Sequence, residues 1–378
     1  MGNTEPLVSV IMPVYNGQKY VENAIESVIK QSYRNFELIC VDDGSTDSTY
    51  SILEKCAHNY SQIKLIRQHN MRQTAARING LEIASGNYAA FIDADDWWEE
   101  SFLKNYMDAM LKKDADIVIG GCWIDNENNH EKKLNNIEDG CYDTEELLKS
   151  FYARMLHYKG FYTFGILPYM CTKVFKKELI LEALKQVDKR VFDGEDVAAC
   201  MGCMTMCSKI VVISDTSYHY VQVSESMTKQ KGNDFYENVS LLYLNMKSIF
   251  QKSTYHEFLL PQLDQYMRYM IWMKAPYAFQ NNNIVRFPFE KIPRYSDIVL
   301  YGAGKIGKEY YKQLVDSKYA NNILWCDKNP SNKEISLPEM IFKEKYDYIV
   351  VAIKDENVIA EVVDYLCANG VDKERIIY

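Results

Sequence analysis

Long apolar runs are missing from this sequence of 378 residues. A membrane-spanning helix needs roughly 18 or more apolar residues, and the closest candidate, residues 269–279, is shorter and contains Lys274 and Pro276. The N-terminus also lacks a basic segment ahead of its first apolar run, which Pro13 interrupts. We therefore expect neither a membrane span nor a signal peptide.

An excess of positive charge is missing as well. The formal net charge is −9, which argues against a nucleic-acid partner, although a local basic groove remains open. The ten cysteines come without a secretory signal, so we expect reduced thiols and a cytoplasmic protein. The length and the ordinary apolar fraction of 47% indicate two or three globular domains.

The first hundred residues alternate strand-like apolar runs with helix-like segments. Residues 7–12 and 36–41 are nearly continuous apolar runs, as in strands that are buried on both faces of a parallel sheet. Residues 20–28 have apolar side chains at helical spacing. Further elements are predicted at 63–66 (strand), 75–84 (helix) and 88–92 (strand). The pattern predicts an open α/β sheet, and such sheets bind ligands outside the carboxyl ends of their strands.

Three acids follow the strand predicted at 88–92. In an extended segment residues i and i+2 share a face, so Asp93 and Asp95 are expected to point into one crevice. Two carboxylates there suit Mn²⁺ or Mg²⁺, which a diphosphate would complete. Asp96 precedes Trp97-Trp98-Glu99, which predicts that it N-caps a helix with Glu99 as its reciprocal partner. The pattern alone leaves open that all three acids are solvated loop residues and caps.

A glycine pattern stands near the other end of the chain. Gly302, Gly304 and Gly307 lie between a predicted strand and a predicted helix, with Asp327 about twenty residues further on. This is the arrangement of a dinucleotide-binding loop. The unit is only half as long as a dinucleotide fold, and the sequence offers no partner for hydride transfer. NAD(P) binding and a nucleotide-free role in docking or assembly both stay open.

Several motifs in the first part of the chain resemble those of family 2 glycosyltransferases of the GT-A fold. They are SVIMPVYN at 9–16, VDDGSTD at 41–47, Ala76-Arg77 with Gly80, FIDADD at 91–96 and GED at 194–196. The resemblance is strongest to the bacterial capsule and surface-polysaccharide branch. One position departs from the family: Ile78 stands where an Asn is usual, so we assign no role to Asn79.

The resemblance implies an α/β architecture of three parts. Residues 1–230 are expected to form the GT-A domain that binds a nucleotide-diphospho-sugar, and residues 231–292 a helical linker or acceptor region. Residues 293–378 are expected to form a small Rossmann-like domain.

The donor is expected to be a UDP-sugar. Uracil offers an N3–H donor that a carboxylate accepts, and cytosine lacks this proton, so Asp43 favours uridine. The alternative is that Asp42 and Asp43 only form an Asx turn with Gly44. By resemblance, the nucleotide-sugar site comprises Pro13, Tyr15, Asn16, Asp43, Arg77, Asp93 and Ala94. By resemblance also, Asp95 is the direct metal ligand and Asp93 contacts ribose or metal. His219, which stands between Tyr218 and Tyr220, is a further candidate for contact with the metal or the diphosphate, and the alternative is that it is a structural histidine.

Asp196 is the expected catalytic base, with Glu195 beside it. A neighbouring like charge raises the pKa of an acid, and a single base with in-line attack inverts the anomeric carbon. The alternative is that Asp196 is only a helix N-terminal acid. A sugar nucleotidyltransferase and a non-catalytic scaffold of a polysaccharide-assembly complex remain alternative functions.

The acceptor is expected to be a hydroxyl of a surface polysaccharide or a lipid-linked glycan. Trp272 and Phe279 in the helical region are expected to contact acceptor or membrane surface, and residues 226–228 resemble a loop that closes over the substrates. We expect a cytoplasmic protein at the inner face of the membrane, with homo-oligomers or polysaccharide-assembly proteins as partners.

Overall fold

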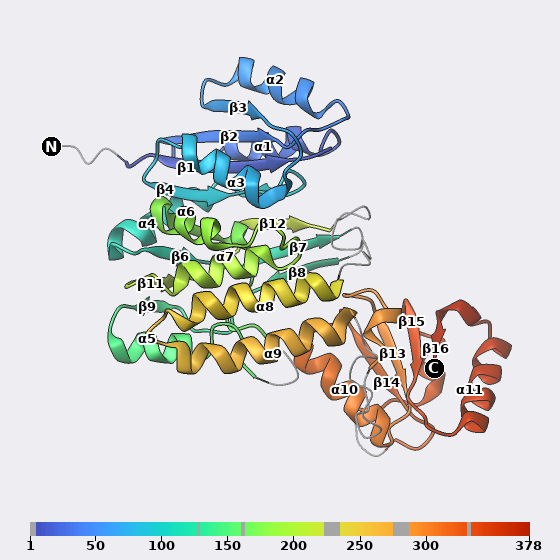
Figure 1. The fold of residues 1–378 in the computed structure, drawn as a ribbon. Coiled ribbons are helices and arrows are strands. Elements are labelled where there is room, and N and C mark those ends of the chain that lie inside the picture. The colour runs from blue at the N-terminus through green and yellow to red at the C-terminus, as the bar shows by residue number, and fades with distance from the viewer. Residues whose placement is uncertain (1–4, 127–128, 160–162, 223–234, 275–286, 331–333) are drawn as a thin grey trace. The chain divides into compact units, whose positions relative to one another are not determined.

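The computed structural model describes residues 5–126, 129–159, 163–222, 235–274, 287–330 and 334–378. The chain divides into two compact units (Figure 1). The first contains Met1–Leu156 and Phe164–Asp264, and the second contains His157–Thr163 and Gln265–Tyr378. The finer division at residues 230 and 292 stays a proposal. The segment 226–228 and Phe279 lie outside the described residues.

The first unit is built on a mixed sheet of eight strands. In spatial order these are β3 (Ile63–Arg67), β2 (Phe36–Asp42), β1 (Val8–Val14), β4 (Tyr88–Phe91), β10 (Lys173–Lys176), β6 (Ile117–Ile119), β11 (Ile210–Val212) and β9 (Gly140–Tyr142). The four strands of the N-terminal half are parallel, as predicted. Every residue of β1 and β2 is buried, which explains their continuous apolar runs.

Helices pack around this sheet, and some of them carry predicted site residues. They are α1 (Val21–Ile29), α2 (Thr49–Asn59), α3 (Arg72–Ile83), α4 (Phe102–Lys113), α5 (Glu145–Tyr152), α6 (Lys177–Gln186), α7 (Glu195–Met204) and α8 (Phe235–Gln251). α3 packs against β1 and β2. Its Gly80 permits this close approach, because a Cβ there would lie 2.8 Å from a methyl group of Ile11.

A second, smaller sheet lies beside the acids that follow β4. Its strands are β5 (Trp97–Trp98), β12 (Tyr218–Val221), β7 (Cys122–Asn126) and β8 (Asn129–Lys133). The prediction that Asp96 caps a helix with Glu99 is therefore wrong. Trp97 and Trp98 pair with β12 instead, and α4 begins only at Phe102 with Ser101 as its N-cap.

The second unit contains a parallel sheet of four strands in the order β14 (Ile323–Cys326), β13 (Ile298–Tyr301), β15 (Tyr348–Val351) and β16 (Ile376–Ile377). The helices α10 (Lys305–Ser317) and α11 (Glu356–Ala368) alternate with the strands, as predicted. One core cluster includes Leu314 of α10 and the other includes Leu366 of α11.

The helix α9 (His256–Lys274) contains the division between the two units. Together with α8 it confirms the prediction that this part of the chain is helical. Among the described residues, no helix combines the length and the apolar composition that a bilayer span requires.

Candidate active site

A buried arginine joins acids from two distant parts of the chain. Arg77 of α3 is 1% exposed, and its guanidinium donates to Asp93 Oδ1 over 3.3 Å. The same guanidinium forms an ion pair with Asp196, at the start of α7. Gly194, with a φ of +91°, makes the turn that begins this helix. The structure thus brings three of the predicted site residues into direct contact.

The charges around Arg77 favour its ionised form. Burial lowers the pKa of the guanidinium, but Asp196, Asp93 and Glu195 outweigh burial and raise it overall. The pKa of Asp93 is raised by burial, although Arg77 opposes this shift. Burial, with the charge of Asp196, raises the pKa of Glu195 to about 8. The surroundings thus favour the charged form of Arg77 and the neutral forms of Asp93 and Glu195.

The segment after β4 turns, so the prediction that it is extended is wrong. The backbone N–H of Asp96 donates to the carbonyl of Asp93 over 3.1 Å. Asp95 remains a half-buried side chain, and burial together with the charge of Asp93 raises its pKa to about 6. The charge of Asp93 thus disfavours the ionised form of Asp95, and a cation between the two carboxylates would offset this repulsion. Asp93 and Asp95 therefore fit a hard divalent ion such as Mn²⁺ or Mg²⁺.

Asp96 supports the site from within the protein. Its carboxylate accepts from the hydroxyl of Tyr218 and, over 2.8 Å, from the backbone N–H of Val221. Burial raises the pKa of Asp96 well above its ordinary value. These contacts anchor the turn after β4 to β12. The sequence analysis did not single out Tyr218 as a site residue, because no local pattern links it to Asp96.

Asp43 lies at the other end of the predicted donor site. It is 4% exposed, and its Oδ1 accepts from Gln68 Nε2 and from the backbone N–H of Met71, each over 2.8 Å. Asn79 in turn donates to Gln68 Oε1 over 2.6 Å. The local turn contact belongs to Asp42, whose Oδ1 accepts from the backbone N–H of Ser45, three residues on. The hydrogen bonds from Gln68 and Met71 both use Oδ1, so within the described residues Asp43 Oδ2 can still accept a hydrogen bond from a nucleobase.

The loops after β1 and β2 are tied together by Asn16. Its Oδ1 accepts from the backbone N–H of Thr46 over 2.8 Å, and its own N–H donates to Ser45 Oγ over 3.0 Å. Tyr15 beside it is 47% exposed, so its ring is available to a ligand. Pro13 is buried inside β1, and Ala94 lies in the turn that follows β4.

His219 groups with other residues than those predicted. Its Nδ1 lies 2.8 Å from Asp125 Oδ2, and its Nε2 lies 3.4 Å from Glu99 Oε1. Among the described residues its ligand atoms cluster with those of Asp125 and His130, while Asp93 clusters with Asp96 and Cys171. Within the part of the chain that the structure describes, His219 is not grouped with Asp93 or Asp95, and its contact with the donor-site metal stays a prediction.

The glycine loop of the second unit has the backbone geometry of its motif. Gly302 has a φ of +114°, and a Cβ on Gly307 would lie 1.9 Å from the carbonyl oxygen of Gly302. A Cβ on Gly304 would meet nothing within 4 Å. Asp327 Oδ2 accepts from the backbone N–H of Ala303 over 2.6 Å, so this carboxylate holds the loop itself. Nucleotide binding at the loop stays a prediction.

Comparison with known proteins identifies relatives of the first unit. Residues 9–180 match the sequence profile of "Glycosyl transferase family 2". The chain is 31% identical over 230 residues to the glycosyltransferase GlyG of Streptococcus pneumoniae. The matched region covers 59% of this chain and 73% of GlyG. The chain spans only 23% of a second pneumococcal relative, the glycosyltransferase GlyA, at 34% identity over 38% of this chain.

Two further relatives carry more specific names. An Escherichia coli protein named UDP-Glc:alpha-D-GlcNAc-diphosphoundecaprenol beta-1,3-glucosyltransferase WfgD is 34% identical, over 41% of this chain and 67% of its own. Among solved structures, S. aureus TarS 1-349 in complex with UDP-GlcNAc aligns with a TM-score of 0.58 and 17% identity. The alignment covers 73% of this chain and 76% of TarS 1-349, and it confirms the predicted GT-A fold.

Proposed function

The chain belongs to glycosyl transferase family 2, and from this premise we propose that it transfers a sugar from a UDP-sugar to a hydroxyl of a surface polysaccharide or a lipid-linked glycan. The contact of Arg77 with both Asp93 and Asp196 carries the proposal. Through Arg77, this contact links Asp93, which is proposed to help hold the metal at the donor diphosphate, to Asp196, which is proposed as the catalytic base. The UDP-sugar named for WfgD and the UDP-GlcNAc bound to TarS support this donor class.

Asp95, assisted by Asp93, is proposed to hold a divalent cation against the donor diphosphate. Mn²⁺ or Mg²⁺ there would neutralise the charge that develops on the leaving UDP. Asp43 is proposed to accept from uracil N3–H, with Gln68 and Met71 fixing its orientation. Tyr15, Pro13 and Asn16 complete the nucleoside side of the site, and Ala94 lies between the two proposed ligands.

Asp196 is proposed to remove the proton of the acceptor hydroxyl. The ion pair with Arg77 fixes one of its oxygens and leaves a side chain that is 31% exposed. The neighbouring Glu195, with a pKa of about 8, stays largely protonated at neutral pH and so does not compete for the proton. One base and in-line attack give inversion at the anomeric carbon.

The remaining predictions concern the rest of the chain. Trp272 in α9 is proposed to contribute to the acceptor region. Peripheral membrane contact, a cytoplasmic location and homo-oligomers or assembly partners remain predictions. The second unit is proposed to bind a nucleotide or to dock a partner through the loop of Gly302, Gly304 and Gly307.

A calorimetric titration of the Mn²⁺-loaded protein with UDP, GDP and CDP tests the donor class. We expect UDP to bind most tightly. Asp43→Asn should lower the ratio of UDP to CDP affinity at least about tenfold, because a hydrogen bond from uracil to a charged acceptor is lost and the amide can donate to cytosine N3. Asp316→Asn, in the second unit, is the control. A ratio unchanged by Asp43→Asn would contradict the assignment of Asp43.

The pKa of Asp95 predicts how donor binding depends on pH. A metal ligand must be deprotonated, and the pKa of Asp95 is raised to about 6. The ionised fraction of Asp95, and with it Mn²⁺-dependent affinity for UDP-glucose, should therefore fall about tenfold from pH 7 to pH 5. UDP-glucose is used because its esterified diphosphate does not titrate in this range. Equal affinity at both values would exclude Asp95 as the titrating ligand.

A further inference from the structure

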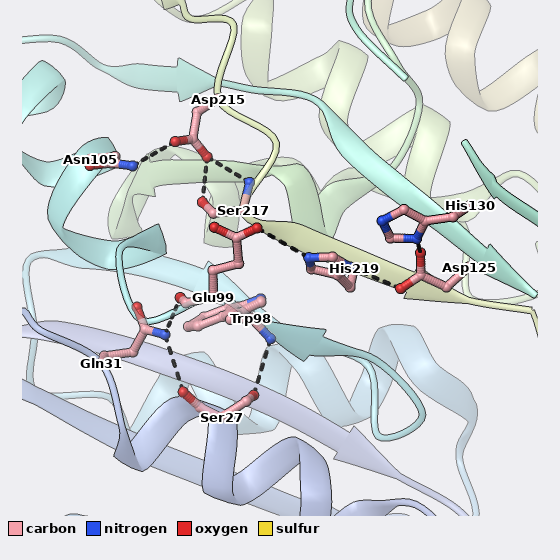
Figure 2. A network of polar contacts seen from close by, with 10 residues as sticks. All are labelled: Ser27, Gln31, Trp98, Glu99, Asn105, Asp125, His130, Asp215, Ser217 and His219. Atoms are coloured by element: carbon pink, nitrogen blue, oxygen red, sulfur yellow. Dashed lines mark hydrogen bonds and ion pairs between the residues drawn. The ribbon is translucent and has the colours of Figure 1, made fainter. Parts of the chain in front are cut away.

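A cluster of two histidines and two acids lies on the second sheet, apart from the acids proposed to hold the donor. Asp125 and His130 are directly opposite each other on β7 and β8. His219 comes from β12, which pairs with β7 on the other side, and Glu99 follows β5. Strand register thus brings together groups that are far apart in the sequence (Figure 2).

The two imidazoles converge on one carboxylate. His219 Nδ1 lies 2.8 Å from Asp125 Oδ2, and His130 Nδ1 lies against Asp125 Oδ1. One ligand atom of each of the three residues lies within 4.8 Å of the other two. Tetrahedral coordination at roughly 2.0–2.2 Å needs ligand atoms roughly 3.3–3.6 Å apart. Small side-chain rotations would therefore place all three around one ion.

The other nitrogen of His219 supports this reading. Its Nε2 faces Glu99 Oε1 over 3.4 Å. A carboxylate that accepts from one ring N–H leaves the opposite nitrogen deprotonated, which is how metal-binding histidines are usually oriented. Figure 2 shows Glu99 and Asp125 on opposite sides of the His219 ring. The backbone of Glu99 is itself fixed, because its N–H donates to the carbonyl of Ser217 over 2.8 Å.

Tryptophan rings hold both imidazoles in place. Trp97 stacks on His219 with ring centroids 3.6 Å apart and an interplanar angle of 14°. Trp123 stacks on His130 at 4.2 Å and 8°. His219 is 5% exposed in its side chain and His130 is 56% exposed, so the cluster has a fixed inner ligand and a solvent-accessible outer one.

We propose that Asp125, His130 and His219 form a second cation site, which binds a borderline transition-metal ion such as Zn²⁺, with Glu99 orienting His219. Two imidazole nitrogens and one carboxylate suit Zn²⁺, whereas the all-oxygen pair Asp93 and Asp95 suits Mn²⁺ or Mg²⁺. The bound ion cross-links β7, β8 and β12. It also fixes Trp97, which directly follows Asp96, so the site stabilises the turn that carries the donor-site acids. The site does not depend on the proposed transferase function.

The test is a calorimetric titration of the full chain with Zn²⁺ in excess Mg²⁺, which occupies the all-oxygen site. We expect one tight Zn²⁺ equivalent. His130→Ala should weaken it at least tenfold, and Glu99→Gln by about 10–100-fold. His58→Ala, an exposed histidine of α2, should leave it unchanged. His130 is chosen because its exposed side chain can be removed without opening the core.

Two further measurements distinguish specific Zn²⁺ binding at this site from nonspecific binding. Co²⁺ in place of Zn²⁺ should give the visible absorption of a tetrahedral N/O site, and His130→Ala should abolish it. Zn²⁺ should raise the melting temperature of the wild-type chain and not that of His130→Ala, because the ion binds only the folded state. Absence of Zn²⁺ binding, or equal binding by wild type and His130→Ala, would overturn the proposal.

Discussion

Asp196→Asn should reduce the rate of sugar transfer by about 10²–10⁴-fold. The amide has the shape of the carboxyl group and still offers an oxygen to Arg77, but it cannot take a proton from the acceptor. Because Asp196 is proposed to act on the acceptor and not on the nucleotide, affinity for the UDP-sugar should change only a few-fold. Initial rates of UDP release in the presence of acceptor, together with calorimetric donor binding, measure the two quantities separately.

Two variants control this experiment. Asp108→Asn removes an exposed carboxylate of α4 that is paired with Lys104, and it should leave the rate unchanged. Glu195→Gln tests the neighbouring acid, which begins the same helix and also interacts with Arg77. A large loss in Glu195→Gln with a normal rate in Asp196→Asn would transfer the role of base to Glu195.

Arg77→Met should lower the free energy of unfolding of the first unit by about 3–5 kcal/mol. The arginine side chain is 1% exposed, and the substitution leaves Asp93 and Asp196 facing each other without their cation. The mutual repulsion of the two acids would no longer be offset. Donor binding and transfer should be lost together, since the two acids would no longer be held in place.

Urea unfolding followed by circular dichroism measures this loss. Arg190→Met is the matched control: the Arg190 side chain is 68% exposed and pairs with Asp188, so its removal should cost about 0–1 kcal/mol. Equal effects of the two substitutions would show that Arg77 is not an organising residue of the site.

Much of the first unit could be predicted because its signals are local. The buried runs in β1 and β2 and the acids at the ends of β2 and β4 are visible in single segments of sequence. Their convergence follows from the general rule that parallel strands present their carboxyl ends at one edge. The motif-level resemblance then led to Asp43 and Asp196, which lie in separate segments.

The errors arose where pairing over long distances overrides a local signal. Asp96 has the sequence surroundings of a helix cap. Trp98, however, pairs with Tyr218, 120 residues later, so a strand and not a helix follows Asp96. The contact of Arg77 with Asp196 spans 119 residues, so no local pattern shows it. The contact of His219 with Asp125 was not predicted for the same reason: its neighbours are set by the register of β12 and β7.

The central claim is that Asp95 and a divalent cation together bind the donor diphosphate. Calorimetric titration of UDP with and without Mn²⁺, in wild type and in Asp95→Ala, tests it most directly. We predict UDP binding that requires Mn²⁺ and is lost in Asp95→Ala. UDP binding that is equally tight without Mn²⁺, or is unchanged in Asp95→Ala, would contradict the proposed metal-dependent mechanism.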